Sequence, residues 1–238
     1  MPANARYESV QVDDDHFDAY CAVPAGGSGP GVLLFQEIFG INDNMRTLAG
    51  QLADAGYVVL VPDMFWRLER RFESKDESGM AAAFALVQKL DFDKAVEDIT
   101  ATHAHLLHMP ECDGKVGAIG FCLGGGLAFA AATMSRVDGR GIDAAVCYYG
   151  SAINGMLGQL PRLECPVQFH YGERDEYIPA ESIDEVEAAV SGRPGVEFYR
   201  YDAGHAFSNE DAPSFYDAAA AAEAWPRTLS FLERHLSR

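Results

Sequence analysis

Residues 115–134 read Lys-Val-Gly-Ala-Ile-Gly-Phe-Cys-Leu-Gly-Gly-Gly-Leu-Ala-Phe-Ala-Ala-Ala-Thr-Met. The run Lys115 to Ile119 is short and mostly apolar, which is typical of a buried strand, and the alanine-rich stretch Leu123 to Met134 favours a helix. Gly120 and Gly124 flank Cys122, and residues without a side chain allow a strand and a helix to approach closely across a tight turn. We therefore predict a strand, a sharp turn centred on Cys122, and a helix.

This strand–turn–helix context is that of a nucleophile elbow, in which a strained turn exposes a reactive side chain at the carboxyl end of a strand. The positive end of the helix dipole would favour the thiolate of Cys122. The alternative interpretation is a small structural cysteine in a glycine-rich turn. The other four cysteines lack this setting, and we expect structural or incidental roles for Cys21, Cys112, Cys147 and Cys165.

Working outward from the elbow, apolar runs and helical periodicity alternate along most of the chain. A hairpin is expected over Ser9 to Val23, before the first core strand. The predicted core strands are Gly31 to Phe35, Tyr57 to Val61, Lys115 to Ile119, Ala144 to Tyr149, Val167 to Tyr171 and Val196 to Tyr201. The predicted helices are Met45 to Ala55, a periodic stretch from Phe84 to Leu107, Leu123 to Met134, Ala180 to Val190 and Ser214 to Leu236. Such alternation predicts an α/β fold with a mainly parallel sheet and helices on both faces.

Two segments depart from simple periodicity. Pro226 lies inside the last predicted helix, where proline removes a backbone hydrogen bond, so a kink or two abutting helices are expected there. The stretch Trp66 to Gly79 is charged and aperiodic, and we expect it to form an irregular loop over a site.

Length and charge restrict the class of protein. A chain of 238 residues with 48% apolar residues is expected to form one domain over residues 1–238 around a single large core. The net charge of −18 would repel phosphate backbones and anionic membranes, so a nucleic-acid or membrane partner is not expected. Met1 to Val10 lacks an apolar signal-peptide run, and no stretch has the length of a membrane span, so we expect a cytoplasmic enzyme.

The chain shows no metal-binding pattern. The five cysteines are an odd number and include no C-x-x-C pair, so at least one thiol stays unpaired within the chain. His105 and His108 are three residues apart and would share a helix face, but His103 is off that face and no third ligand is evident. We therefore predict no metal site.

A cysteine nucleophile requires a base that holds its proton and later delivers it to the leaving group. His205 is the best candidate, because it follows a predicted strand and titrates in the right range. Asp175, which also follows a strand, would orient the imidazole, and the order Cys122, Asp175, His205 is the chain order of α/β-hydrolases. Glu173 and Glu176 are weaker candidates for the acid. Asp175 as a cap of the helix near Pro179, and His205 as an ordinary loop histidine, are the alternatives.

Three segments together resemble the dienelactone hydrolase family, also called carboxymethylenebutenolidases. They are the glycine-flanked Cys122, the Gly-Glu-Arg-Asp loop at 172–175 and the Ala-Gly-His-Ala-Phe loop at 203–207. The sequences Phe-Gln-Glu-Ile-Phe-Gly at 35–40 and Val-Pro-Asp-Met-Phe at 61–65 extend the resemblance, which spans about Gly31 to Leu236. It implies an α/β-hydrolase fold, a small ester or lactone as the substrate, and hydrolysis through an acyl-enzyme.

The resemblance also implies roles for particular residues. The glutamate that matches Glu37 interacts with the cysteine in that family and helps to generate the thiolate when substrate arrives. The backbone N–H groups of Ile38 and Leu123 would form the oxyanion hole, since the fold supplies one donor after the nucleophile and one after the first core strand. No cofactor is required, and a monomer or small homo-oligomer is expected.

One departure from the family concerns the substrate. Well-known dienelactone hydrolases bind a substrate carboxylate with two arginines, and this chain has Asn209 at one position and no arginine in Met80 to Phe84 at the other. Asparagine cannot replace the charge of arginine. Arg67, Arg70 or Arg71 in the predicted loop would be a substitute, or else part of a solvated run of charges.

Other functions remain compatible with the same residues. Thioester hydrolysis or acyl transfer would use the same triad. A non-catalytic binding protein or a thiol-redox sensor would use the fold and Cys122 without the triad. The presence of both Asp175 and His205 argues against the sensor, which needs no general acid.

Overall fold

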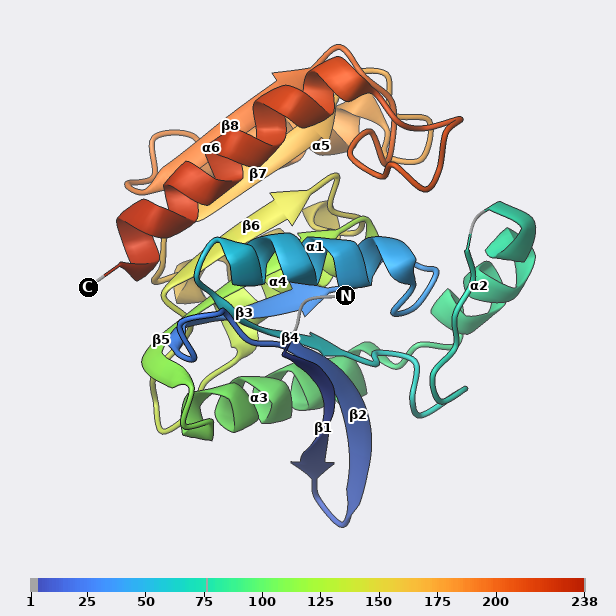
Figure 1. The fold of residues 1–238 in the computed structure, drawn as a ribbon. Helices are drawn as coiled ribbons and strands as arrows, with labels where there is room; N and C mark the ends of the chain where they lie inside the picture. Colours follow the sequence, from blue (N-terminus) through green and yellow to red (C-terminus); the bar gives the residue numbers. More distant parts are fainter. Residues whose placement is uncertain (1–3, 76, 238) are drawn as a thin grey trace.

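The computed structural model describes residues 4–75 and 77–237, so the first three residues of the N-terminal segment and residue 76 of the predicted loop lie outside the described residues. The described chain forms a sheet of eight strands in the order β1-β2-β4-β3-β5-β6-β7-β8 (Figure 1). β1 and β2 form an antiparallel hairpin, β2 pairs with β4 antiparallel, and every other neighbouring pair is parallel. The predicted mainly parallel sheet is confirmed.

The strands are β1 Ala5–Val12, β2 Asp15–Ala22, β3 Gly29–Phe35, β4 Val58–Pro62, β5 Cys112–Phe121, β6 Ala144–Tyr148, β7 Val167–Gly172 and β8 Val196–Tyr201. The α-helices are α1 Asp43–Asp54, α2 Met80–Val87, α3 Phe92–His108, α4 Leu123–Met134, α5 Ala180–Val190 and α6 Ala218–Leu236. Two 3-10 segments, η1 Glu77–Gly79 and η2 Asn154–Arg162, complete the order. Each predicted strand and the opening hairpin is present, with ends that differ by a few residues.

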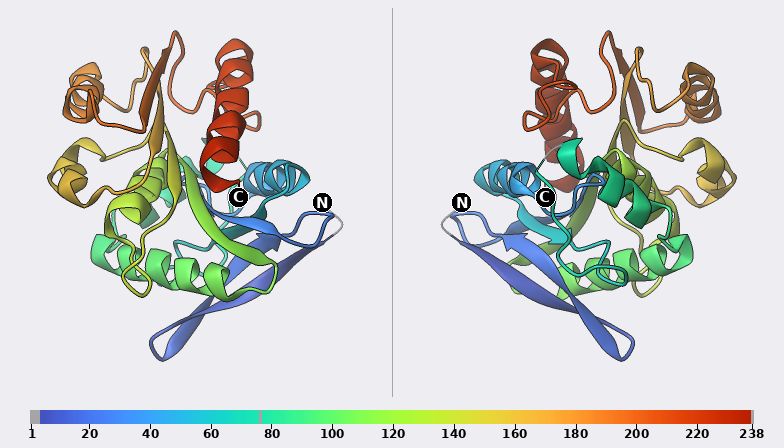
Figure 2. Two further views of the ribbon diagram at one scale, coloured as in Figure 1. Left: turned by 90° about the vertical axis from the view of Figure 1, so that its left-hand side faces the viewer. Right: turned by 90° about the vertical axis from the view of Figure 1, so that its right-hand side faces the viewer.

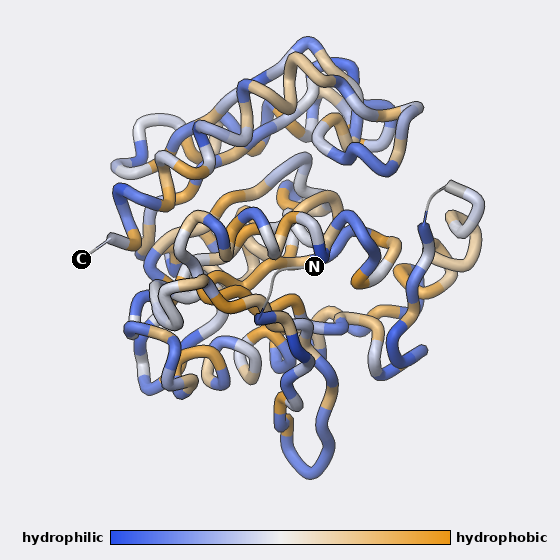
Figure 3. The backbone as a smooth tube through the Cα atoms, in the orientation of Figure 1, coloured by the Kyte–Doolittle hydropathy of each residue, from blue (hydrophilic) through white to orange (hydrophobic). Residues whose placement is uncertain are grey.

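Helices cover both faces of the sheet. Figure 2 shows α1 and α6 on one face and α3, α4 and α5 on the other. The middle strands are buried from both sides: all residues of β4, β6 and β7 are buried, including the polar side chains of Gln168 and His170 in β7. Figure 3 shows the resulting hydrophobic interior and the hydrophilic tip of the β1–β2 hairpin. No helix in the described part of the chain is long and apolar enough to cross a membrane.

The periodic stretch Phe84 to Leu107 is two helices and not one, which corrects the prediction. α2 ends at Val87, and α3 begins after Asp91, whose side chain accepts a hydrogen bond from the backbone N–H of Lys94 at 3.2 Å. Asp91 is thus an N-cap that starts a new helix. The break matters because it separates α2 from the helical layer, and Figure 1 shows α2 at the edge of the molecule.

The last helix also differs from the prediction. It begins at Ala218 and not at Ser214, because Asp217 caps it by accepting the N–H groups of Ala219 and Ala220, each at 3.0 Å. Pro226 lies inside this one continuous helix, so the alternative of two abutting helices is wrong. The first predicted turn of this helix, residues 214–217, is therefore loop.

The segment predicted as a loop over a site is irregular, and its aromatic residues pack against β2 and against a small apolar cluster. Trp66 is buried and stacks on Phe17 of β2, with ring centroids 5.3 Å apart. Phe72 packs against a small cluster of Ile38, Phe39 and Ala83. The residues that reach over the sheet edge belong to α2, which follows this segment.

Candidate active site

Cys122 lies at the turn between β5 and α4, as predicted. Its backbone has φ 55° and ψ −116°, a conformation that L-residues rarely adopt, and it forms the N-cap of α4. Gly124 permits the turn, because a Cβ at this position would lie 2.3 Å from the carbonyl oxygen of Phe35. The backbone N–H of Cys122 donates to the carbonyl of Tyr148 in β6 at 3.1 Å. The turn is therefore held from both neighbouring strands.

His205 and Asp175 meet from two separate loops. His205 Nδ1 lies 2.7 Å from Asp175 Oδ2, and both side chains are buried. Asp175 follows β7 and His205 follows β8, so the parallel sheet brings their loops to one edge. The other Asp175 oxygen accepts the N–H groups of Tyr177 and Ile178 at 2.8 and 2.9 Å. Asp175 does not cap α5, whose N-cap is Pro179 without a side-chain hydrogen bond, so the capping alternative is wrong. One oxygen of Asp175 fixes its own turn and the other contacts His205.

The surroundings of His205 favour its charged form. Burial by itself lowers the pKa of His205, but the hydrogen bond to Asp175, the hydrogen bond to Cys122 and the negative charges of both outweigh it, and raise the pKa to about 10. Cys122 Sγ also lies 3.8 Å from Ser151 Oγ. Cys122, His205 and Asp175 are thus brought together, in the arrangement that an acid–base pair beside a nucleophile requires.

Glu37 is buried next to these residues, and its oxygens are held by two side chains. Asn209 donates its amide to Oε2 at 2.5 Å, and the Tyr149 hydroxyl donates to Oε1 at 3.2 Å. Tyr149 in turn shares a 2.7 Å hydrogen bond with Ser208. Burial raises the pKa of Glu37, against the positive charge of His205 and the two hydrogen bonds, which lower it. Glu37 is therefore positioned by Asn209 and Tyr149, and not by Cys122.

Ile38 and Leu123, whose N–H groups are the predicted oxyanion donors, both line the cavity that contains Cys122 and His205. Ile38 follows the end of β3, and Leu123 is the first residue of α4. Among the described residues, no protein acceptor takes the backbone N–H of either one. Their N–H groups are thus available to a substrate oxygen.

A cavity of about 220 Å³ joins these groups. Its polar side consists of Glu37, Cys122, Ser151, Tyr177, His205 and Asn209, and its apolar side of Ile38, Phe39, Met80, Phe84, Val87, Leu123, Ala206, Ala212 and Phe215. Three of the apolar residues come from α2, which forms one wall. A small apolar cavity with a few convergent polar groups is the usual form of a small-molecule site.

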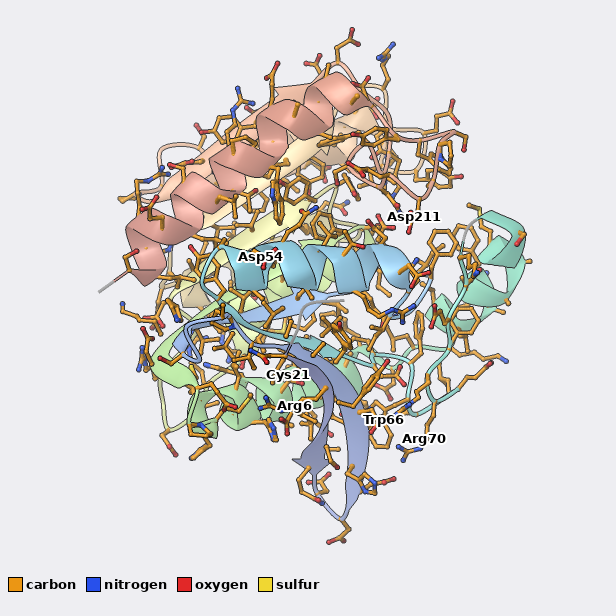
Figure 4. The ribbon with its side chains drawn as sticks, in the orientation of Figure 1. Arg6, Cys21, Asp54, Trp66, Arg70 and Asp211 are labelled. Carbon is orange, nitrogen blue, oxygen red and sulfur yellow. The ribbon has the colours of Figure 1, made fainter. Side chains whose placement is uncertain are left out.

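Arg67, Arg70 and Arg71 do not line this cavity, and each is paired with a carboxylate elsewhere. Arg67 binds Asp98 at 2.7 Å. Arg70 and Arg71 bind Asp15 and Asp18 at 3.2 and 2.7 Å. Figure 4 shows Arg70 and Trp66 beside the β1–β2 hairpin, away from Asp211 on the loop before α6. A substitute role for these arginines in substrate binding is therefore not supported.

Several cavity residues were not predicted from the sequence. Tyr149 and Ser151 directly follow β6, so the rule that located Asp175 and His205 in post-strand loops would have found them too. Asn209 was identified only as a missing arginine, and its contact with Glu37 joins residues 172 positions apart. Phe215 and Met80 carry no such signal, because they lie in a loop and at a helix start.

The remaining histidines and cysteines do not form a metal site in the described part of the chain. Within residues 4–75 and 77–237, no group of three or more His, Cys, Asp or Glu side chains is arranged to hold a metal ion. His103 is buried with Ser135 at 3.0 Å, and His105 lies 3.7 Å from Glu8. All five cysteines are free thiols.

The family model and the similar curated proteins indicate the same family. Residues 17–236 match the model of the dienelactone hydrolase family. A carboxymethylenebutenolidase of Pseudomonas putida is 36% identical over 228 residues, which cover 94% of each chain. A carboxymethylenebutenolidase of Rhodococcus opacus is 35% identical over 225 residues, which cover 89% of this chain and 83% of the relative.

Solved structures agree with this result. A dienelactone hydrolase-like promiscuous phosphotriesterase from metagenomic libraries has a TM-score of 0.80 and 27% identity, and the match covers 98% of this chain and 99% of that one. A dienelactone hydrolase from Anabaena variabilis has a TM-score of 0.72 over 98% of both chains, at 18% identity, and therefore supports the fold alone. The architecture is the α/β-hydrolase fold.

Proposed function

This chain belongs to the dienelactone hydrolase family, and from that premise we propose that it hydrolyses a small ester or lactone with Cys122 as nucleophile, His205 as acid and base, and Asp175 as the group that orients His205. The observation that carries the proposal is the position of Cys122 at a strained elbow, in one cavity with a His205 that is bound to a buried Asp175. The family membership makes the chain a dienelactone hydrolase-like hydrolase, and the mechanism through Cys122, His205 and Asp175 is the part that we propose.

In the first step the Cys122 thiolate forms a bond to the carbonyl carbon, and the electron pair of the C=O bond moves to oxygen. The N–H groups of Ile38 and Leu123 stabilise that negative oxygen, because they point a fixed dipole at charge that develops only in the transition state. The C=O bond then re-forms and the C–O bond to the leaving alcohol breaks. His205 supplies the proton that the departing alkoxide takes up.

The second step removes the acyl group from Cys122. Neutral His205 now accepts a proton from water, and the hydroxide formed attacks the thioester carbonyl. Collapse of the intermediate breaks the C–S bond, releases the carboxylic acid and restores the thiolate beside the protonated His205. In a lactone, the alcohol of the first step stays attached to the acyl chain, so a single hydroxy acid leaves.

Glu37 is assigned the task of accepting the Cys122 proton when substrate arrives, as the family resemblance implies. A buried carboxylate with a raised pKa is suited to accept a proton. Its oxygens are held by Asn209 and Tyr149 in this structure, so the transfer requires Glu37 to turn from these partners toward the thiol.

The test is turnover of 4-nitrophenyl acetate, a panel of lactones and a panel of acyl thioesters by the wild type and by Cys122→Ala and His205→Ala. Each variant should lose about 10³-fold or more in kcat on esters and lactones. Cys112→Ala, which removes a thiol that does not line the cavity, is the matched control and should retain activity.

Three outcomes would contradict this proposal. Full activity of Cys122→Ala would exclude the nucleophile. Turnover of thioesters alone would make the protein a thioesterase on the same triad, and rapid peroxide modification of Cys122 without any turnover would favour a redox protein.

A further inference from the structure

We propose that this site accepts neutral, apolar esters or lactones and discriminates against substrates that carry a carboxylate. The inference rests on the proposed function and adds the substrate class. It depends on two properties of the cavity around Cys122: its walls are largely apolar, and none of the described residues that line it is lysine or arginine.

The walls of the cavity are apolar and come from four parts of the chain. Phe84 belongs to α2, Phe39 to the loop after β3, Leu123 to the start of α4, and Phe215 to the loop before α6. Because the elements are separate in sequence, the apolar lining is not the face of one helix. A carboxylate placed between such walls loses its hydration without gaining hydrogen bonds.

The charged groups of the cavity give an anion no counter-charge. The described residues that line it include the acidic side chain of Glu37, the thiol of Cys122 and the imidazole of His205, and none is lysine or arginine. The positive charge of His205 is already neutralised by buried Asp175 at 2.7 Å. A substrate carboxylate would therefore meet Glu37 without a free cation.

Asn209 leaves this position of the site without a cation that could bind an anion. Its amide donates to Glu37 at 2.5 Å, so the hydrogen-bonding need of that carboxylate is met by a neutral group. An arginine in the same place would have brought a positive charge, but an amide brings none. Like charges that are brought together away from water repel each other, so we expect the site to bind an anion less well than a neutral group.

The exposed residues of the cavity and the net charge of the protein also favour a neutral substrate over an anion. Phe84 and Tyr177 are 38% and 47% exposed, and both line the cavity, so an apolar substrate meets aromatic surface as it enters. The net charge of −18 adds a long-range repulsion that slows the approach of anions.

The first experiment compares 4-nitrophenyl hexanoate with 4-nitrophenyl hydrogen adipate, in which a carboxylate replaces the terminal methyl group. Release of 4-nitrophenolate gives kcat/KM for both, corrected for uncatalysed hydrolysis. The wild type should prefer the neutral ester by about tenfold or more. Equal values, or a preference for the adipate, would overturn the inference.

Variants place a cation in the cavity. Phe84→Arg should reduce the preference for the neutral ester about fivefold or more, because an arginine at the mouth can pair with the adipate carboxylate. Phe92→Arg is the matched control, since Phe92 is also 38% exposed but does not line the cavity, and it should leave the preference unchanged. The same change in both variants would attribute the preference to net charge alone and overturn the role of the cavity.

A second measurement does not depend on turnover. Iodoacetamide and iodoacetate differ by one charge, and the rates at which they alkylate Cys122 can be compared with their rates on a free thiol. The ratio of the amide rate to the acetate rate should exceed that of the free thiol about fivefold or more. Discrimination without hydrolysis of any ester would retain the neutral preference and reject the proposed function, whereas hydrolysis without discrimination would do the reverse.

Discussion

Asp175 divides its two carboxylate oxygens between a backbone turn and an imidazole. Oδ1 accepts the N–H groups of Tyr177 and Ile178, and Oδ2 lies 2.7 Å from His205 Nδ1. One side chain thereby fixes its own loop and the orientation of His205. Residues with two such duties are sensitive to changes that alter only one of them.

Asp175→Asn should keep the turn and impair the imidazole. The amide oxygen can still accept the two N–H groups, but its NH₂ group would face His205 Nδ1 and favour the wrong tautomer. We expect kcat to fall by about 10³-fold or more with little change in the melting temperature. Asp202→Asn, at an exposed aspartate paired with Arg174, is the control and should be active. A fully active Asp175→Asn would remove this residue from the mechanism.

The raised pKa of His205 predicts a dependence of stability on pH. Because the pKa is about 10 in the folded protein against an ordinary 6.5, protonated His205 stabilises the fold fully below about pH 6.5, and this contribution is lost as the pH rises toward 10. The free energy of unfolding of the wild type, minus that of His205→Gln, should therefore fall between pH 6.5 and 9 by roughly 1–3 kcal/mol. Urea unfolding at several pH values measures it, and a difference that grows with pH would contradict the prediction.

Residues at the site were predictable where a local rule places them. Cys122, Asp175 and His205 follow predicted strands, and parallel strands bring such loops to one edge of a sheet. Asn209 and Phe215 were not predictable as cavity residues, because their positions depend on how the loop before α6 folds back. Short-range periodicity contains no information about such a return.

At the scale of elements, the packing of α4 against the sheet depends on the absence of side chains. A Cβ on Gly125 would lie 2.6 Å from Gly150 Cα, so the helix N-terminus approaches the loop after β6 at backbone distance. This close approach puts Cys122 at the floor of the cavity.

Gly125→Ala should therefore destabilise the protein by about 1–3 kcal/mol, despite the higher helix propensity of alanine, since the added methyl group meets backbone that cannot yield easily. Gly155→Ala is the matched control, because nothing lies within 4 Å of a Cβ at that exposed position. It should change stability by less than about 1 kcal/mol. Denaturant midpoints compare the two, and an equal effect would show that the close approach is not required.

Element boundaries show where sequence patterns lose information. The helical period runs through residues 88–91 without a fault, yet α2 and α3 are separate because Asp91 caps the second. Likewise Asp217 sets the start of α6, four residues after its predicted beginning at Ser214. Apolar spacing detects a helix that has a buried face, but capping is a polar interaction that this spacing does not record.

For the whole molecule, alternating strands and helices predicted the sheet and its coverage, but not the strand order. β4 lies between β2 and β3, and β1 and β2 extend the sheet at one edge. The buried parallel strands are all rich in apolar residues, so composition does not distinguish one neighbour from another and long-range packing decides the order.

Burial should make four of the five thiols unreactive and leave Cys122 as the reactive one, because a raised pKa lowers the fraction of thiolate. Burial raises the pKa of Cys21 and of Cys165 to about 12, and it also raises the pKa of Cys112 and Cys147. Neutral 4,4′-dithiodipyridine should therefore react rapidly with one thiol of the native protein and with five after unfolding. Cys122→Ala should show no rapid phase in the native state, and a rapid phase that survives in this variant would place the reactive thiol elsewhere.

The positive φ of Cys122 has a consequence for the evolution of the chain. A left-handed backbone at an L-residue costs about 1–3 kcal/mol, and glycine would relieve much of that cost. Replacing Cys122 with glycine would thus yield a more stable protein that lacks the proposed nucleophile. If Cys122 is the nucleophile that we propose, selection for stability opposes it at its own position and selection for activity retains it.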